Sequence, residues 1–353
     1  MGKINRREAL TGIGATMGAM TASLAQAHDT TAPKGAWTTV APLPAPVQEI
    51  YPAPFFYDRP GREFERAPYN IIVSAGGLTP DSDHNVTDAV TYYDPLYDEW
   101  GFATKLPAPR HHIGLVNNRG YLYALGGFSR QPGAGWRMER DCWRLSSVDG
   151  DWDAVAPLPI PQAENVCVSL GGYIHVVGGR SPAGSLNAKW SDHIDTSEHW
   201  LYDASIDRWF SLAPLPTERN SAAGVVFSGT VYVFGGRTVD GGNSNAVEVY
   251  DPLADRWEKA RPMPQAQGGL AAAVLNGKIY VFGGEYFSPR PGGVFNETWE
   301  YDPYRDTWRA VAPMSRPRHG LGAVSLGDAI YAIGGAAGVG GVGTTSAVDK
   351  FEI

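Results

Sequence analysis

Short runs of alternating apolar and polar residues recur along the chain, and each run ends in a pair of glycines. The first run is NIIVSAGG at Asn70–Gly77, and the last is IYAIGG at Ile330–Gly335. A period of two in hydrophobicity predicts β-strands that pack against neighbouring sheets. The six pairs recur about every 50 residues, a spacing typical of propeller repeats. They begin at Gly76, Gly126, Gly178, Gly235, Gly283 and Gly334.

Two further markers keep fixed distances from the glycine pairs. A tryptophan precedes the next pair by 26 residues in five repeats, and an aromatic-Asp pair such as Tyr93-Asp94 lies seven residues before a tryptophan. Each repeat therefore predicts four strands: a after a Pro-rich turn, b ending in Gly-Gly, c ending in Tyr-Asp and d beginning at Trp. The tryptophans are Trp37, Trp100, Trp152, Trp209, Trp257 and Trp308.

This combination of glycine pair, tyrosine and tryptophan resembles the kelch repeat, and the resemblance covers about Trp37–Ile353. It implies an all-β, six-bladed propeller. The last repeat stops at Ile353 before its d strand, while Trp37 begins a d strand that has no a, b or c strand before it. We therefore expect residues 36–42 to complete the last blade and close the ring, which removes an open sheet edge. The expected blades are 47–106, 109–158, 161–215, 218–263, 266–314 and 317–353 with 36–42.

The first 27 residues differ from the repeats in composition. A basic start with Arg6-Arg7, a mildly apolar run and Ala25-Gln26-Ala27 predict a signal peptide, residues 1–27. The arginine pair resembles a twin-arginine export signal, with an ordinary secretory signal as the alternative. Either signal predicts a periplasmic or secreted bacterial protein, with the propeller in 28–353 and no membrane insertion after cleavage.

Charge and cysteine content narrow the possible partners. The formal charge of −8 becomes −10 when the signal peptide is removed, which disfavours nucleic acid and anionic membranes. Cys142 falls on a third strand and Cys167 on the first strand of the next repeat, so we expect the two thiols to stay unbridged.

The connections between strands b and c vary most in length, and the longest belongs to the third repeat. Variable loops on a rigid scaffold are where binding usually resides, so we predict the functional face on the b–c side. The interval from Trp37 to Gly76 is 13 residues longer than in the other repeats, and the extra residues are assigned to the region of Asp58–Pro68, in an a–b turn on the opposite face.

Arginines at the starts of strands a are candidates for binding an anion. Arg110, Arg219 and Arg318 lie 16 residues before a glycine pair, at a position held by Gln162 and Gln267 in other repeats. The resemblance to kelch adaptors that bind acidic peptides implies that these arginines hold a ligand carboxylate. The alternative is that they bond turn carbonyls or neighbouring acidic side chains.

Other polar residues are expected to gather near the same ends of the strands. A histidine and a carboxylate in such a pocket could act as general acid and base, and the alternative is a hydrated funnel without chemistry. Glu49 corresponds in the first repeat to Glu164, and His175 is expected to be a packing residue. The candidates that join the three arginines are His111, His112, Glu164, Arg180, Trp190, Asp192, His193, Asp195, Arg237, Glu285 and His319.

Asp192, His193 and Asp195 could bind a divalent metal, but short Asp/His runs commonly stabilise loops, so we predict neither a metal nor a cofactor.

We expect an exported module that binds a small anionic or carbohydrate-like ligand or a protein partner. The alternative is a cofactor-free sugar epimerase, since the fold and expected location are similar to those of a kelch sialic acid mutarotase. A copper oxidase is disfavoured because neither Cys142 nor Cys167 is placed to form the Tyr–Cys crosslink of that family. The oligomeric state is left open.

Overall fold

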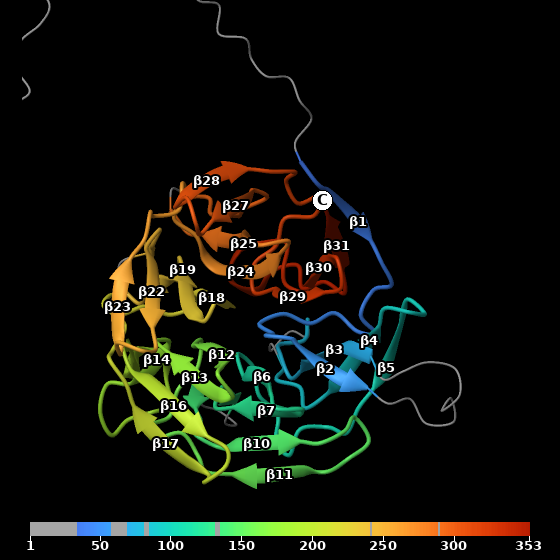
Figure 1. Ribbon diagram of the computed structural model, residues 1–353. Helices are drawn as coiled ribbons and strands as arrows, with labels where there is room; N and C mark the ends of the chain where they lie inside the picture. Colours follow the sequence, from blue (N-terminus) through green and yellow to red (C-terminus); the bar gives the residue numbers. More distant parts are fainter. Residues whose placement is uncertain (1–33, 58–68, 81–84, 131–134, 241, 289) are drawn as a thin grey trace, which may run out of the picture. The chain divides into compact units, whose positions relative to one another are not determined.

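The computed structural model describes residues 34–57, 69–80, 85–130, 135–240, 242–288 and 290–353. The predicted signal peptide, 1–27, and the predicted insertion, 58–68, lie outside the described residues. The described part contains six antiparallel blade sheets in chain order, each with four main strands, and a short fifth strand extends one of them (Figure 1). This arrangement confirms the predicted all-β, six-bladed propeller.

Each blade contains strands a to d in the order expected from the repeat, and the bounds are as follows. Blade 1 is β2 (Ala53–Tyr57), β3 (Tyr69–Ala75), β4 (Val90–Asp94) and β5 (Glu99–Phe102). Blade 2 is β6 (Gly114–Asn118), β7 (Tyr121–Leu125), β10 (Cys142–Leu145) and β11 (Trp152–Val155). Blade 3 is β12 (Val166–Leu170), β13 (Tyr173–Val177), β16 (His199–Asp203) and β17 (Arg208–Ser211).

The second half of the ring repeats the pattern. Blade 4 is β18 (Ala223–Phe227), β19 (Thr230–Phe234), β22 (Val247–Asp251) and β23 (Arg256–Lys259). Blade 5 is β24 (Gly268–Leu275), β25 (Lys278–Tyr286), β27 (Thr298–Asp302) and β28 (Thr307–Ala310). Blade 6 is β29 (Gly322–Leu326), β30 (Ala329–Ile333), β31 (Val348–Glu352) and β1 (Ala36–Thr39).

The b–c connections contain additional short elements. Blade 2 has the hairpin β8 (Phe128–Arg130) and β9 (Trp136–Met138), and blade 4 has β20 (Arg237–Thr238) with β21 (Gly242–Asn243). The long loop of blade 3 contains β14 (Arg180–Pro182), the 3-10 turn η1 (Trp190–Asp192) and β15 (His193–Asp195). Blade 5 adds β26 (Gly293–Val294), and blade 6 adds η2 (Val339–Gly341).

The first strand closes the ring, as the sequence predicts. β1 pairs antiparallel with β31, with Ala36 opposite Glu352 and Trp37 opposite Phe351. The innermost strands β2, β6, β12, β18, β24 and β29 contact one another in succession, and β29 contacts β2. In Figure 1, β1 accordingly lies along the outer edge of β31. The closing strand ends at Thr39, earlier than the expected residue 42.

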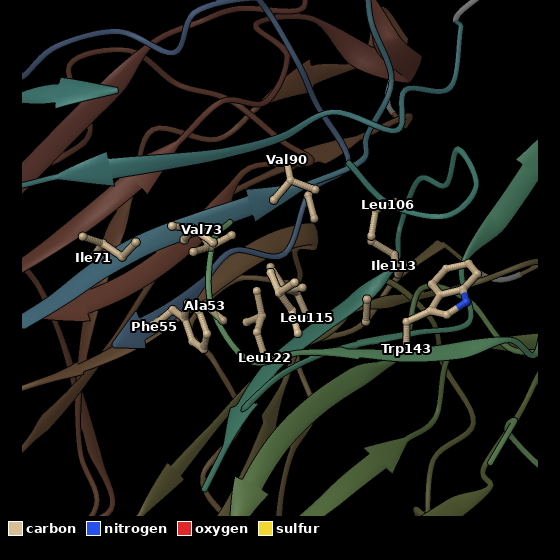
Figure 2. Close-up of a cluster of buried hydrophobic side chains, with 14 residues drawn as sticks. Ala53, Phe55, Ile71, Val73, Val90, Leu106, Ile113, Leu115, Leu122 and Trp143 are labelled. Atoms are coloured by element: carbon tan, nitrogen blue, oxygen red, sulfur yellow. The ribbon is translucent and has the colours of Figure 1, made fainter. Parts of the chain in front are cut away.

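An apolar core fills every junction between neighbouring blades. Figure 2 shows the junction of blades 1 and 2, where Phe55 and Val73 pack with Leu115 and Leu122. Alternation along the strands makes this possible, because successive side chains face the blade before and the blade after. The ring is thus stabilised by six separate cores.

The repeated tryptophans also connect the blades through hydrogen bonds. The indole of Trp100 donates to the carbonyl of Ala41, and that of Trp152 donates to Thr104, in each case four residues after the preceding tryptophan. The series returns to its start, since Trp37 donates to the carbonyl of Ala312 at 3.0 Å. The three remaining bonds run from Trp209 to Ala156, from Trp257 to Ala213 and from Trp308 to Arg261.

The glycine pairs lie where one blade meets the next. At the first pair, a Cβ atom on Gly76 would come within 2.2 Å of the carbonyl oxygen of Arg110, and one on Gly77 within 2.4 Å of Val47. Both glycines have positive φ, which is unfavourable for other residues. The pair therefore allows strand b to end close against the neighbouring backbone.

The two cysteines are free, as expected from their places on β10 and β12. Burial raises the pKa of the Cys142 thiol to about 12 and raises that of Cys167 further. Both thiols therefore remain protonated and unreactive at neutral pH.

Candidate functional site: an acid–base network at the ring axis

At or shortly before the start of each inner strand, one residue adopts a left-handed backbone conformation, and these six positions surround the axis. Their φ values lie between 48° and 67°. In five of the six cases, the N–H of this residue donates to the carbonyl of the equivalent residue in the preceding blade. Examples are the bonds from His112 to Glu49 and from Gly320 to Gly269. The six are Glu49, His112, Glu164, Ser221, Gly269 and Gly320. These backbone hydrogen bonds join the starts of neighbouring inner strands around the axis.

The side chains of three of these positions take part in a closed circuit of acids and bases, which we call the axial network. It consists of Glu49, His112, Glu164, Arg237, Glu285 and His319. His112 Nε2 lies 2.7 Å from Glu49 and 3.5 Å from Glu164, and Arg237 lies 3.9 Å from Glu164. Arg237 also pairs with Glu285, and His319 completes the circuit at 3.4 Å from Glu285 and 3.6 Å from Glu49.

Carboxylates alternate with basic groups around this circuit, and the side chains are buried except for those of Glu49 and Arg237, which are partly buried. Their exposed fractions run from 0% for Glu164 to 13% for Arg237. Buried charges are tolerated when they are paired, so each carboxylate requires its two basic neighbours. The network thus neutralises much of its own charge, which leaves little attraction for an additional anion.

Two histidines form a proton-linked chain from this network. Burial by itself lowers the pKa of His112, but the Glu49 carboxylate and its hydrogen bond leave that pKa above its ordinary value. Burial by itself raises the pKa of Glu49, and His112, His319 and Arg237 reverse this and hold it far below its usual range. His112 Nδ1 lies 2.7 Å from His111 Nδ1, whose pKa is lowered by burial and by His112. These opposite pKa shifts favour a proton on His112 and a neutral ring at His111.

Aromatic side chains cover the arginines that border the axis. The Arg180 guanidinium lies 2.7 Å from Glu164 and is stacked on the Trp190 ring at 3.8 Å from its centroid. Arg237 lies 5.7 Å from the Phe287 ring centroid in the same way. Trp190 is 42% exposed and Phe287 is 51% exposed. Each ring therefore presents one apolar surface to solvent and the other to a buried cation.

A cavity of about 100 Å³ lies between inner-strand residues of blades 2 to 6 and the segment that leads into β2. Small residues from blades 4 and 5 line much of it, but Tyr51, Asn165 and Cys167 add polar atoms. The Asn165 amide nitrogen is buried without a hydrogen-bond partner within the described protein atoms. A polar cavity of this size is suited to a few ordered water molecules.

The hypothesis that Arg219 and Arg318 hold a ligand carboxylate disagrees with their positions. Both are 1% exposed. Their Nε atoms donate to the carbonyls of Gly235 and Gly334, the first glycines of their own pairs, at 2.7 and 2.8 Å. Arg219 also pairs with Glu248, and Arg318 with Asp349 at 2.6 Å. These contacts correspond to the structural alternative, because the guanidinium groups satisfy acceptors inside the blade.

Arg110 is likewise occupied within its blade. It is 5% exposed, donates to the Pro109 carbonyl at 2.9 Å and pairs with Asp141 at 3.0 Å. The three arginines of equivalent sequence position therefore do not form one ligand-binding group over the axis.

The acidic residues of the blade 3 loop have structural partners as well. Asp192 accepts hydrogen bonds from the backbone N–H groups of Ala188 and Lys189, and Asp195 accepts from Asn220 and Val239. His193 is buried beside Phe128 and Trp190. In the described portion of the chain, no group of three or more His, Cys, Asp or Glu side chains is arranged to hold a metal ion.

The structure thus brings together seven of the predicted site residues with Glu49. Those seven are His111, His112, Glu164, Arg180, Arg237, Glu285 and His319. Trp190 lies at the border of this group. Phe287 was not predicted, although it lies only two residues after Glu285, at the start of a loop on the predicted face. No helix among the described residues is long and apolar enough to cross a bilayer.

Comparison with known protein families agrees with this architecture. The model of the KLHDC2/KLHL20/DRC7 Kelch-repeats domain matches residues 168–344, half of the chain. The chain belongs to the kelch family. Kelch propellers commonly bind protein partners.

Individual kelch relatives match smaller parts. Beta-scruin of Limulus polyphemus is 30% identical over 182 residues, which cover 50% of this chain and 19% of the relative. Kelch-like protein 22 of Homo sapiens is 32% identical over 127 residues, which cover 35% of this chain and 19% of the relative. This kelch chain therefore spans about a fifth of the length of these curated relatives.

A solved structure matches nearly the whole propeller. The structure titled "Structure of YjhT" has a TM-score of 0.71 and 17% sequence identity, over 89% of this chain and 96% of that chain. At this identity the likeness shows a shared fold.

Proposed function

We propose that this kelch propeller is a binding module that docks a protein partner on its b–c face. The observation that carries this proposal is the apolar border of that face. Large apolar side chains from the loops of blades 3, 5 and 6 are exposed there, where exposure costs free energy unless a partner covers them. They are Leu186, Trp190, Ile194, Phe287 and Val342.

The rigid support beneath these side chains favours recognition by this face. Trp190 rests on Arg180, which is itself paired with buried Glu164, and Asp192 holds the backbone of the same loop. Aromatic side chains that are fixed before binding lose little entropy when a partner arrives, which is typical of binding hot spots. The internally paired axial network makes an apolar partner surface a better match than a small anion.

The proposal is tested by comparing partner capture by matched variants. Trp190→Ala and Phe287→Ala should each weaken capture from an extract of the source organism at least tenfold, because each removes a central aromatic contact. Leu253→Ala is the control, since Leu253 is 97% exposed on a c–d turn. Equal capture by all four proteins, wild type included, would contradict the proposal.

A cofactor-free sugar epimerase or mutarotase that acts on sialic-acid-like substrates is a second candidate function. The chain Glu49–His112–His111 supports it, because one distance of 2.7 Å joins the carboxylate to His112 and a second joins His112 to His111, as a path for a proton requires. Proton NMR of freshly dissolved sialic acid tests this function. Anomer exchange should be faster than in buffer and should slow with His112→Gln, whereas an unchanged rate with the wild-type protein excludes the reaction for that substrate.

The proposed site of action is the periplasm or the exterior of a bacterial cell. This part of the proposal rests on residues 1–27, whose basic start and small-residue cleavage site favour export. Separating periplasmic from cytoplasmic fractions and sequencing the N-terminus of the mature protein would test it, with cleavage after Ala27 as the expected result.

A further inference from the structure

A second cavity lies away from the axis, between the b–c connections of blades 2 and 3. Its volume is about 540 Å³, within the range of small-molecule sites. Arg137 of β9 lines one side, while Ser181 and Pro182 of β14 line the other. Ile160 and Pro161, in the turn that leads from blade 2 to blade 3, complete the apolar part of the lining. The axial network contributes none of the lining residues described.

The walls of this cavity are held in place by bonds that cross between the blades. The amide nitrogen of Asn187 donates to the Met138 carbonyl at 2.8 Å, and the Met138 N–H donates to the Asn187 side-chain oxygen at 3.0 Å. The Ala183 N–H donates to the Asp192 carbonyl at 2.8 Å within the same loop. These hydrogen bonds connect the long loop of blade 3 to the hairpin of blade 2, so the cavity is formed without a ligand.

The charged group at this cavity retains hydrogen-bonding capacity. The Arg137 side chain is 52% exposed, and its Nε lies 3.6 Å from Glu139 Oε1, which is too long for a hydrogen bond. The same Glu139 oxygen already accepts a hydrogen bond from Ser129 at 2.5 Å. Arg137 is thus within ion-pair distance of Glu139, but among the described residues its guanidinium makes no hydrogen bond, so its two terminal nitrogens can pair with an incoming carboxylate in a bidentate manner.

We propose that this cavity binds a small organic monocarboxylate with an apolar body. The carboxylate pairs with Arg137, and the Ser181 hydroxyl adds a polar contact on the opposite wall. The apolar body lies against Ile160, Pro161 and Pro182, whose ring and branched side chains leave little conformational entropy to lose. This site and its ligand class are separate from the partner-binding function proposed above.

The test uses the full chain with hexanoate as the probe and hexanamide as its uncharged analogue. Saturation-transfer NMR should show that hexanoate binds and that hexanamide binds at least tenfold more weakly. Arg137→Gln should weaken hexanoate binding at least tenfold, and Ser185→Trp should block it, because Ser185 lines the cavity with its side chain exposed. Arg256→Gln is the matched control, since Arg256 lies on β23 with its side chain 64% exposed.

Two results would overturn this proposal. Equal binding of hexanoate and hexanamide would show that charge recognition is absent, and equal hexanoate binding by Arg137→Gln and Arg256→Gln would show that Arg137 is not the anchor. Neither result depends on the partner-capture experiment, whose variants Trp190→Ala and Phe287→Ala leave the cavity lining unchanged.

Discussion

Arginine has two distinct structural roles in this propeller, which differ in whether the side chain points into its own blade or toward the axis. Arg219 and Arg318 point into their own blades, where they bond the glycine-pair carbonyls and a buried carboxylate. Arg180 and Arg237 directly follow the glycine pairs and reach the axial network. The local sequence does contain a signal for the first use. Gln162 occupies the position equivalent to Arg219 and donates to the carbonyl of Gly178, 16 residues later. Because both Arg and Gln occur at this position, what the position requires is a side-chain hydrogen-bond donor to the glycine carbonyl, and the positive charge of arginine is less important for that bond.

Replacing Arg219 should therefore affect stability and leave recognition intact. Arg219→Gln removes the partner of fully buried Glu248, which should cost about 3–5 kcal/mol in the free energy of unfolding. Arg110→Gln is the milder comparison, because its partner Asp141 has a side chain that is 54% exposed. Urea denaturation measures both. The double variant Arg219→Gln/Glu248→Gln should regain part of the lost stability, because it leaves no unpaired charge. Equal losses for the two single variants, or no such regain in the double variant, would contradict this account.

Two glycines among the six positions of left-handed backbone conformation around the axis give a matched pair of variants for testing the axial network. In Gly320→Ala the new Cβ would lie 2.7 Å from the Glu49 carboxyl carbon, whereas in Gly269→Ala the nearest atoms lie 3.7 Å away. Both positions have positive φ, so both variants should lose about 1 kcal/mol of stability from backbone strain. Gly320→Ala should lose at least another 1 kcal/mol and should shift the NMR-detected titration of His112, because Glu49 must move. The same stability and titration in both variants would show that the network tolerates this displacement.

At the level of elements, the repeat markers predict the main strands well and the loop hairpins poorly. The distances between Trp, Tyr-Asp and Gly-Gly are set by blade packing, so every four-stranded sheet could be placed from sequence. The ladders β8–β9 and β14–β15 contain three residues per strand, too few for alternation to be recognised. Their register depends on contacts between blades, such as those of Asn187 with Met138. For the same reason the candidate site was predicted only in part. The sequence indicated the b–c face of the propeller, but it did not indicate which side chains pair with one another there.

The closing strand β1 should be essential for stability. A chain that starts at Ala45 lacks β1, leaves the edge of β31 unpaired and loses the hydrogen bond from Trp37 to Ala312. It also loses the packing of Trp37 on Phe282 and Phe351. We expect the midpoint of thermal unfolding to fall by at least 10 °C, or cooperative unfolding to disappear. A chain that starts at Ala32 keeps β1 and serves as the control. Similar midpoints for the two shortened chains would show that blade 6 is stable with three strands.

At the scale of the whole molecule, a buried histidine pair makes the ring sensitive to acid. His175 Nδ1 lies 2.9 Å from His199 Nε2, and His199 Nδ1 donates to the Ala213 carbonyl at 3.1 Å. Both rings pack near Tyr250 of blade 4. Burial lowers the pKa of His175 to about 4 and, helped by His175, that of His199 to about 3. The expected packing role of His175 is thus accompanied by an electrostatic one.

The direction of the pH effect follows from these values. The unfolded chain takes up protons on both histidines near pH 6.5, whereas the folded chain does not until the pH approaches 4. Stability should therefore fall as the pH drops from about 6.5 toward 4, by up to about 1.4 kcal/mol per pH unit for each histidine. His175→Gln/His199→Gln should reduce this slope in urea denaturation measured between pH 7 and 4.5. An unchanged slope would assign the acid sensitivity to other groups.

The pairing of β1 with β31 has a consequence for the order of events in the cell. These two strands are separated by almost the entire propeller sequence, so β1 is synthesised long before its partner. β1 stays unpaired while blades 1 to 5 form, and blade 6 is complete only when β31 has paired with β30 and β1. Because this contact joins residues far apart in sequence, its loop-closure entropy is large, and we expect closure of the ring to be a late step in folding.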